Sequence, residues 1–322
     1  MKIVDGAAGY AATAATAAAA TVERPALAVA IGNFDGVHLG HAALLAEARA
    51  RAARRGGQSA VLTFTPHPAR LFAPDRAPPL IMSLDRRLAL IAEAGIDVAI
   101  VEPFTRAFAA IEAPAFVRDV LARDLGARDV VVGHDFSFGR GRTGDVRMLG
   151  ELAPAVGADV AVIPAVAVDG VTCSSGRIRA LVAAGDVAAA AKLLGRPFEL
   201  EGPVARGAGR GRGLGFPTAN VVPDGELRPK LGIYASRALV LDGPLAGTAR
   251  AAALSVGTNP QFASGAGVTI EAYLLDFDGD LYDRRLRIEV GELLRNERRF
   301  ESIDALIAQI REDVAQVRGI SS

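Results

Sequence analysis

Short apolar runs alternate with amphipathic stretches through the first half of the chain. The apolar runs are rich in Val, Ile and Ala, whereas the stretches between them carry apolar residues at helical spacing. This alternation is typical of parallel strands joined by crossover helices, so we predict an α/β fold with a Rossmann-like N-terminal domain. Strands are predicted at residues 26–31, 60–64, 98–101, 130–132 and 160–163, and helices at residues 83–94, 115–125, 177–184 and 187–194.

Beyond Pro197 the pattern changes to short strands separated by Gly and Pro. Residues 232–241, 251–256, 269–277 and 285–290 fit strands of a small antiparallel β-barrel. The last stretch predicts a C-terminal helix that packs on the barrel, with an apolar stripe made of Ile303, Leu306, Ile307, Ile310, Val314 and Val317. We therefore place a domain boundary at Pro197, which gives domains 1–196 and 197–322.

The length and composition agree with two globular domains. A chain of 322 residues exceeds the size at which a single core usually keeps growing. Lys plus Arg and Asp plus Glu number 36 each, so charge alone favours neither nucleic acid nor a membrane as a partner. The single Cys173 cannot form an internal disulfide, which favours a reducing, cytoplasmic location. Asp5 and Glu23 interrupt the Ala-rich residues 1–25, which we interpret as a low-complexity lead-in rather than a signal peptide or membrane span.

The segment GNFDGVHLGHAALL at residues 32–45 carries the strongest chemical signal. It follows the first predicted strand and leads into a helix, and its glycines allow a phosphate to approach free N–H groups. His38 and His41 are three residues apart, so one helical turn can direct both rings at an anion, as adenylyl transfer requires. The alternatives are a tight turn with solvated histidines, or a zinc site. Zinc is disfavoured because the chain has four histidines and no carboxylate with clear ligand spacing.

Two later segments also fall at predicted strand ends. In GHDFSFGRGRTGD, Phe136 and Phe138 offer flat apolar faces to a ring, while Arg140 and Arg142 can reach phosphate; ordinary core and surface roles are an equal alternative. In CSSGRIRALVAAGD, Ser174 and Ser175 fit the start of a helix, which would explain these serines by capping alone. Arg177 and Arg179 follow them, where they can hold a triphosphate.

The second half contains a glycine-rich run, GPVARGAGRGRGLGFPTAN, at residues 202–220. Such a loop can wrap phosphates, although no GK[ST] follows as in a P-loop. Thr218 and Asn220 are oxygen donors on one face of a strand, and Glu271 alternates with apolar neighbours, so it can point into a site. A flexible hinge and a solvated strand carboxylate are the alternatives. Asp278-Gly279 is predicted to form a hairpin turn.

Taken together, these segments resemble the bacterial bifunctional riboflavin kinase and FMN adenylyltransferase family, also called FAD synthetase. The likeness rests on GNFDGVHLGH, TFTPHP, DFSFG and SSGRIR in the first half, and on GRGLGFPTAN, GIYA, VGTNPQF and IEAYLLDFDGDLY in the second. The pairing of HxGH with FPTAN in one chain is highly specific. Gly176 departs from the family, which usually has Thr at this position.

The resemblance implies two ATP sites, with Mg²⁺ as cofactor and with riboflavin, FMN and FAD as substrates or products. It implies catalytic roles for His38, His41 and Glu271, and Mg²⁺ binding by Thr218 and Asn220. Nucleotide binding is implied for Gly32, Asn33, Phe34, Asp35, His38, His41, Ser174, Ser175, Arg179, Gly209, Gly215, Thr218 and Asn220. Flavin binding is implied for Phe64, Pro66, Asp135, Phe136 and Phe138.

Two other functions compete with this one. The first is a single-activity adenylyltransferase for another phosphorylated vitamin, and the second is a flavin-binding regulator without turnover. The PTAN motif with Glu271 argues against the first, and the retained histidines argue against the second. Nothing in the sequence assigns an oligomeric state.

Overall fold

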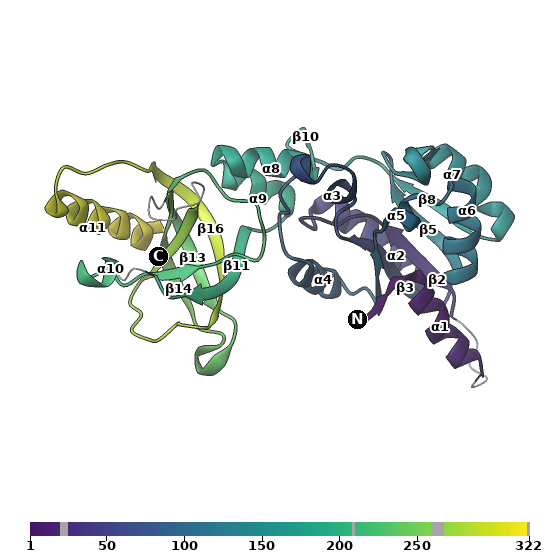
Figure 1. Ribbon diagram of the computed structural model, residues 1–322, viewed down its shortest axis with the longest axis horizontal. Coiled ribbons are helices and arrows are strands. Elements are labelled where there is room, and N and C mark those ends of the chain that lie inside the picture. The colour runs from purple at the N-terminus through teal and green to yellow at the C-terminus, as the bar shows by residue number, and fades with distance from the viewer. Residues whose placement is uncertain (20–24, 208–209, 259–266, 321–322) are drawn as a thin grey trace. The chain divides into compact units, whose positions relative to one another are not determined.

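The computed structural model describes residues 1–19, 25–207, 210–258 and 267–320 (Figure 1). The chain forms two compact units. The first comprises residues 1–78 and 84–173, and the second comprises residues 79–83 and 174–322. By its packing, the helical stretch before Pro197 belongs to the second unit. The functional boundary at Pro197 stays a prediction.

A six-stranded parallel sheet forms the centre of the first unit, with the strand order β1-β4-β3-β2-β5-β8. All the strands predicted in this half are confirmed. Their bounds are β1 (Lys2–Asp5), β2 (Leu27–Ile31), β3 (Gln58–Thr65), β4 (Val98–Pro103), β5 (Ala127–Gly133) and β8 (Asp159–Ile163). Every residue of β2 is buried, so both faces of the sheet are covered there, which explains the continuous apolar sequence of this strand.

The helices of this unit follow the strands in alternation. They are α1 (Gly6–Ala19), α2 (Leu39–Arg54), α3 (Pro68–Phe72), α4 (Leu84–Glu93), α5 (Arg106–Ala109), α6 (Ala113–Ala115), the π-helical segment η2 (Phe116–Asp124) and α7 (Val146–Leu152). The helices predicted at residues 83–94 and 115–125 are confirmed as α4 and η2. Two-stranded pairs complete the unit, β6 (Ser137–Phe138) with β7 (Gly144–Asp145) and β9 (Ala167–Val168) with β10 (Val171–Thr172).

The interpretation of the N-terminal residues as a lead-in is wrong. Residues 2–5 form β1, an edge strand that pairs in parallel with β4. The Ala-rich stretch that follows forms α1, which buries Ala7 and Tyr10 in the apolar core of the sheet. Because Ala is the strongest helix former, a run that looks like low complexity is here an ordinary helix.

The order of the strands determines where the loops that carry the candidate site lie. From β2 the chain continues to β3 on one side, while β5 pairs with β2 on the other side. Ligands of open parallel sheets bind at the carboxyl edge beside such a change of direction. The residues that follow β2, β3, β4 and β5 all lie at this edge.

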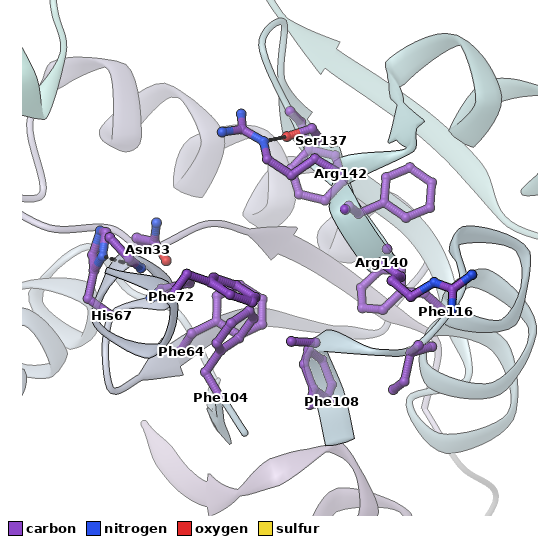
Figure 2. A pocket seen from close by; sticks show the side chains of 18 of the residues that line it. Asn33, Phe64, His67, Phe72, Phe104, Phe108, Phe116, Ser137, Arg140 and Arg142 are labelled. Atoms are coloured by element: carbon purple, nitrogen blue, oxygen red, sulfur yellow. Dashed lines mark hydrogen bonds between the residues drawn. The ribbon is translucent and has the colours of Figure 1, made fainter. Parts of the chain in front are cut away.

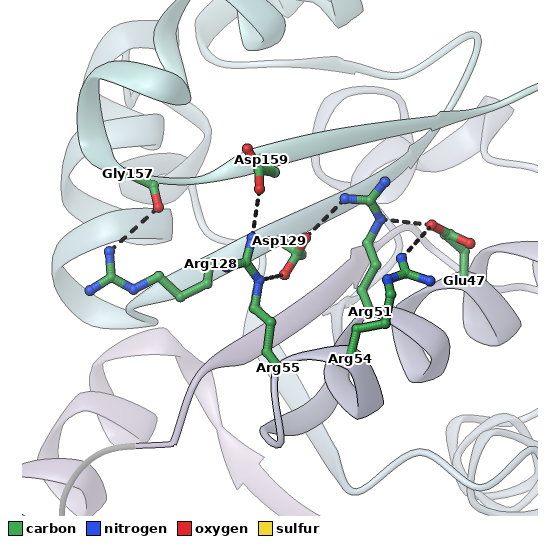
Figure 3. A network of polar contacts seen from close by, with 8 residues as sticks. All are labelled: Glu47, Arg51, Arg54, Arg55, Arg128, Asp129, Gly157 and Asp159. Atoms are coloured by element: carbon green, nitrogen blue, oxygen red, sulfur yellow. Dashed lines mark hydrogen bonds and ion pairs between the residues drawn. The ribbon is translucent and has the colours of Figure 1, made fainter.

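A network of ion pairs holds the C-terminal end of α2 (Figure 3). The carboxylate of Asp129, near the start of β5, is buried and accepts hydrogen bonds from Arg51, at 2.9 Å, and from Arg55. Arg55 also pairs with Asp159 at the start of β8, and Arg51 pairs with Glu47 at 2.7 Å. The last turn of α2 is therefore fixed at the amino edge of the sheet, and its first turn points to the carboxyl edge.

The second unit contains a closed antiparallel barrel with the strand order β11-β12-β15-β14-β13-β16. The predicted barrel is confirmed, with β11 (Phe198–Ala205), β12 (Ala219–Val221), β13 (Gly232–Val240), β14 (Ala249–Thr258), β15 (Val268–Leu274) and β16 (Arg285–Asn296). Its helices are α8 (Ser175–Ala184), α9 (Val187–Leu194), α10 (Arg210–Gly213) and α11 (Ile303–Ile320). Short 3₁₀ turns complete the described chain at η1 (Pro74–Arg76), η3 (Arg140–Arg142), η4 (Pro154–Val156) and η5 (Gly243–Leu245).

The hairpin turn predicted at Asp278-Gly279 is wrong. Strand β15 pairs with β12 and β14, whereas β16 pairs with β11 and β13. Residues 275–284 therefore connect two strands that are not neighbours in the barrel. A local turn signature cannot show which strand lies beside which.

The C-terminal helix packs on the barrel as predicted, except that Ile303, at the start of the predicted stripe, is 64% exposed. Helix α11 lies against β13 and β14 (Figure 1). Val317 is buried beside Ala235 and Leu275. Asp313 is also buried on this helix and pairs with Arg295 of β16 at 2.7 Å. Among the residues that the structure describes, no helix is long and apolar enough to span a membrane.

Candidate active sites

The turn between β2 and α2 adopts a strained backbone. Phe34, Gly36 and Val37 have φ values of 50°, 93° and 38°, in the left-handed region that Gly tolerates and a β-branched residue resists. Strain of this kind costs on the order of 1–3 kcal/mol per residue and persists only where the surroundings enforce it. Here the Phe34 ring is fully buried, and the Val37 N–H donates to the Phe34 carbonyl at 3.1 Å. The turn is therefore a fixed element rather than a flexible loop.

His38 and His41 come together at the start of α2, as predicted. His38 is the N-cap of the helix, and its Nδ1 accepts a hydrogen bond from the His41 main-chain N–H at 3.3 Å. The two imidazole rings stack, with centroids 3.7 Å apart. Because Nδ1 of His38 is an acceptor, its Nε2 carries the proton of the neutral ring and can donate to a ligand.

The first turn of α2 adds the partial positive charge of the helix dipole to the histidines. Two of its N–H groups already have partners, because the His41 N–H donates to His38 Nδ1 and the Gly40 N–H donates to the Cys173 thiol. Gly32, Asn33, Phe34 and Asp35 precede this turn, with Phe34 and Asp35 buried. The arrangement can hold a phosphate and stabilise negative charge that develops on it.

An aromatic cavity of about 660 Å³ lies at the same carboxyl edge (Figure 2). Four strand ends contribute to its lining, through Asn33 after β2, Phe64 and His67 at β3, Phe104 after β4 and Asp135 after β5. Its size falls within the range of about 300–1,000 Å³ that is usual for small-molecule sites.

Phenylalanine rings form much of the cavity wall. The Phe64 ring lies 5.6 Å from Phe104, and the Phe136 and Phe138 rings stack with centroids 5.5 Å apart. Such faces suit a flat aromatic ligand. Of the residues predicted to bind flavin, Phe64, Asp135, Phe136 and Phe138 line the cavity. Pro66 does not line it, although the next residue, His67, does.

Arginine side chains lie among the cavity residues. Arg142 donates to the Ser137 hydroxyl at 2.7 Å (Figure 2). Arg140 pairs with Glu112 at 2.6 Å. Both arginines line the cavity and keep further N–H groups for an anionic substituent of its ligand. Gly32 and Asn33 line the same cavity, so the strained turn and the aromatic wall share residues.

Ser174, Ser175 and Arg179 belong to the second compact unit. Ser174 caps α8 by accepting a hydrogen bond from the Arg177 N–H at 3.2 Å, which confirms its capping role. Ser175 is the first residue of that helix. Arg179 donates to the Pro79 carbonyl at 2.7 Å. Nucleotide binding by these residues stays a prediction.

The barrel brings together Thr218, Asn220 and Glu271. Asn220 of β12 lies directly opposite Glu271 of β15, so their side chains share a face of the barrel wall. The Thr218 hydroxyl donates to the Glu271 carboxylate at 3.3 Å. A carboxylate, a hydroxyl and an amide therefore form one polar group.

Glycines of the preceding loop pack directly on this group. A Cβ atom at Gly207 would lie 2.2 Å from the Asn220 amide nitrogen, and one at Gly211 would lie 2.4 Å from the Phe216 carbonyl oxygen. A side chain at Gly207 would displace the Asn220 amide, and one at Gly211 would collide with main-chain atoms. Sequence reasoning selected Gly209 and Gly215 instead; Gly209 lies outside the described residues, and Gly215 has a φ of 86° with open space around it.

Sequence reasoning also missed polar residues beneath the strained turn. Arg87 of α4 and Thr63 of β3 are buried and contact the Asn33 carbonyl. The burial of Arg87 was detectable in the sequence, because Arg87 lies on the apolar face of its helix, three residues after Leu84 and four before Ile91.

Comparison with known proteins gives consistent matches to both units. The FAD synthetase family model matches residues 21–177, and the riboflavin kinase family model matches residues 194–321. The bifunctional riboflavin kinase/FMN adenylyltransferase of Escherichia coli (strain K12) is 39% identical over 289 residues, covering 89% of this chain and 90% of the relative. The protein of the same name from Pseudomonas fluorescens is 38% identical over 292 residues, covering 91% of this chain and 92% of the relative.

A solved structure is similar over nearly the whole length. It is a crystal structure named as a macrolide-efflux protein from Streptococcus pneumoniae, with a TM-score of 0.83, 26% sequence identity and coverage of 99% of both chains. The family matches to both parts of the chain and the curated relatives at 38–39% identity agree on one family. This chain therefore belongs to the bifunctional riboflavin kinase/FMN adenylyltransferase family.

Proposed function

We propose that the barrel unit phosphorylates riboflavin with ATP to give FMN, and that the sheet unit adenylylates FMN with ATP to give FAD. One observation supports the second step most directly. The stacked histidines at the start of α2 follow a turn whose residues Gly32 and Asn33 also line the aromatic cavity. A phosphate site and a site for a flat ring thus share one turn, which suits a reaction between ATP and FMN.

In the adenylylation step, an oxygen of the FMN phosphate attacks the α-phosphorus of ATP. The bond between this phosphorus and the oxygen that bridges to the β-phosphate breaks, and pyrophosphate leaves. His38 and His41 donate hydrogen bonds to the α-phosphate and the leaving pyrophosphate, and the positive end of the α2 dipole adds to their effect. Neither histidine attacks phosphorus; both stabilise the negative charge as it moves.

The aromatic cavity holds the flavin ring during this step. Phe64, Phe136 and Phe138 contact its faces, Asp135 binds a polar edge, and Pro66 shapes the loop that carries His67. Asn33, Phe34 and Asp35 position the ATP. Ser174, Ser175 and Arg179, at the start of α8, are also proposed to bind nucleotide.

In the kinase step, the terminal hydroxyl oxygen of the ribityl chain attacks the γ-phosphorus of ATP, and ADP leaves. Glu271 orients this hydroxyl and accepts its proton. Gly209 and Gly215, with Gly207 and Gly211, let the loop backbone approach the phosphates. Phosphoryl transfer depends mainly on positioning, which the close packing of this loop on Asn220 provides.

The donor set of the barrel site fits Mg²⁺. Thr218 and Asn220 supply hard oxygen ligands beside Glu271, and Mg²⁺ typically takes few protein ligands together with substrate phosphates and water. No cluster of three or more His, Cys, Asp or Glu side chains suited to a metal occurs in the described ranges, so the ion would depend on ATP. When bound, it supplies positive charge against the phosphates.

The direct test is to incubate the purified protein with riboflavin, ATP and Mg²⁺ and to follow flavins by chromatography. FMN should appear first and FAD second, with ADP and pyrophosphate as the other products. Supplied FMN should give FAD without riboflavin. FAD from FMN but no FMN from riboflavin would leave a single-activity adenylyltransferase, and flavin binding without either product would indicate a regulator.

We further propose that the protein acts in the cytoplasm, where its small-molecule substrates are found, without nucleic acid or a membrane as partner. The free Cys173 and the balance of 36 basic and 36 acidic residues support this placement. Fractionation of cells should recover the FAD-forming activity with the cytosol; recovery with membranes would contradict the proposal.

A further inference from the structure

Arg87 is buried directly beneath the turn that connects β2 to α2. Its guanidinium is carried by α4, and the residue is only 4% exposed. Its Nη1 donates to the Asn33 carbonyl at 2.6 Å and to the Thr63 hydroxyl at 3.3 Å. The Thr63 hydroxyl in turn donates to the same carbonyl at 3.2 Å. Two buried side chains therefore hold one main-chain oxygen of the turn.

The turn also carries a buried negative charge close to Arg87. Asp35 is 2% exposed, and its carboxylate acts electrostatically on the guanidinium. Burial lowers the pKa of Arg87 and the Asp35 charge opposes that effect, but an arginine stays protonated in proteins. Without the guanidinium, the Asp35 carboxylate would lose this nearby positive charge, beside the site proposed for the ATP phosphates.

The position of Asn33 matters for both substrates of adenylylation. Its neighbour Phe34 is held at a φ of 50°, at the start of the strained turn that leads to the histidines. Asn33 itself lines the aromatic cavity, and its Oδ1 is buried without a hydrogen-bond partner among the described residues. His67 lines the same cavity (Figure 2).

We propose that Arg87 is a positioning residue for adenylyl transfer, which fixes the turn between the ATP site and the flavin cavity by holding the Asn33 carbonyl and balancing the Asp35 charge. This inference rests on the proposed function of the sheet unit. Arg87 acts through Asn33 and Asp35 and not by contact with the reacting phosphates.

The chain offers a matched control on the same helix. Arg86 precedes Arg87 on α4, is 7% exposed and pairs with Glu93 of the same helix at 3.0 Å. Arg86→Met and Arg87→Met both remove a buried guanidinium from α4, but only the second removes the donor to Asn33. Arg87→Lys keeps the charge and a single donor group, so it should rescue part of the effect.

The experiment measures FAD formation from supplied FMN by the full-length variants, with riboflavin phosphorylation by the same samples as an internal control. Arg87→Met should raise the KM for ATP by about 10-fold and lower kcat by roughly 10²-fold, because a small misplacement in a reacting site has effects of this size. Arg87→Lys should fall between it and the parent. Arg86→Met should change the KM for ATP by less than about 2-fold.

The KM for ATP separates positioning from stability. A variant that is partly unfolded contains fewer active molecules, so its apparent kcat falls while its KM stays unchanged. An unchanged KM for ATP in Arg87→Met, or an equal rise in Arg86→Met, would overturn the proposal. If Arg87→Met does not fold, Thr63→Val decides: it removes one donor to Asn33 and should raise the KM about 3-fold, whereas the parental KM would refute the inference.

A failure of the proposed function can be distinguished from a failure of the inference about Arg87. If the parental protein forms no FAD from FMN, that function has failed, and the role of Arg87 is then judged by calorimetric binding of ATP. Equal affinity of the parent and Arg87→Met for ATP would overturn the inference, and an affinity at least about 10-fold weaker in the variant would support it.

Discussion

The hydroxyl of Thr218 donates a hydrogen bond to the carboxylate of Glu271 at 3.3 Å. Thr218 immediately precedes β12, and β12 pairs with β15, the strand that carries Glu271. The proposed metal ligand and the proposed base therefore contact each other, but substitutions can distinguish them. Glu271→Gln keeps size and hydrogen bonding while removing the charge that accepts a proton. We expect its kcat for riboflavin phosphorylation to fall by roughly 10² to 10⁴-fold, with little change in the KM for riboflavin.

Thr218→Val is the companion substitution. It removes an oxygen ligand and leaves the carboxylate, so it should raise the Mg²⁺ concentration needed for half-maximal activity as well as slow the reaction. Asn220→Ala should behave in the same way. Adenylylation of supplied FMN should remain at the parental rate in all three variants. If Glu271→Gln phosphorylates riboflavin normally, Glu271 is only a strand carboxylate.

The second prediction concerns His38 and uses its role as a helix cap. Asn is also a good N-cap residue, so His38→Asn removes the imidazole and keeps an acceptor for the first turn, whereas His38→Ala removes both. Both variants should lose about 10²-fold or more in adenylylation. Only His38→Ala should also lose stability, by about 1 kcal/mol in urea unfolding.

His41→Ala should show the same loss of FAD formation, with riboflavin phosphorylation close to normal. The ring centroids lie 3.7 Å apart, so we expect the two histidines to act on one ligand and the double variant to lose less than the product of the single effects. Parental adenylylation in a folded His41→Ala protein would remove the histidine assignment.

The third prediction tests the packing of the glycine-rich loop. Gly207→Ala places a methyl group where the Asn220 amide lies, and we expect riboflavin phosphorylation to fall at least about 10-fold. Gly213→Ala is the matched control, because a Cβ atom there meets no neighbour within 4 Å. Its activity should stay within about 2-fold of the parent. Equal activity of the two variants would show that the close approach at Gly207 is unimportant.

The fourth prediction concerns independent folding of the barrel unit. Helix α9 packs against β11 and β16, and it buries Val187 and Leu193. The fragment 174–322 retains this helix, and it should unfold cooperatively and phosphorylate riboflavin. The fragment 194–322 loses these buried side chains, each worth about 1.5–3 kcal/mol. Urea unfolding should therefore show a lower midpoint for the shorter fragment, and equal midpoints would show that α9 is dispensable.

Much of the fold could be predicted from the sequence because its elements have regular patterns. Strand β2 is buried on both faces and reads as a continuous apolar run, and α11 shows its stripe at helical spacing. The pairing of strands is not local information. The connection between β15 and β16 was misjudged for that reason, since its turn signature is independent of which strands become neighbours.

The candidate sites were predictable where chemistry and local structure coincide. His38 and His41 are three residues apart on a helix start, so their contact follows from helical geometry. Arg87 contacts Asn33 from α4, and Gly207, just after β11, packs against Asn220 of the neighbouring strand β12. Such contacts depend on tertiary packing, so a single sequence contains only indirect signs of them.

Residues 79–83 bear on the order in which the two units can fold during synthesis. They belong to the second compact unit, where Leu80 exchanges hydrogen bonds with Glu226 and Leu227. During synthesis the last strand of the sheet, β8, is complete at Ile163, well before those partners leave the ribosome. Since N-terminal domains generally fold first, the sheet unit can form while residues 79–83 still await the barrel. Translation thus sets an order of assembly in which an already folded unit presents a short segment that the later barrel must capture.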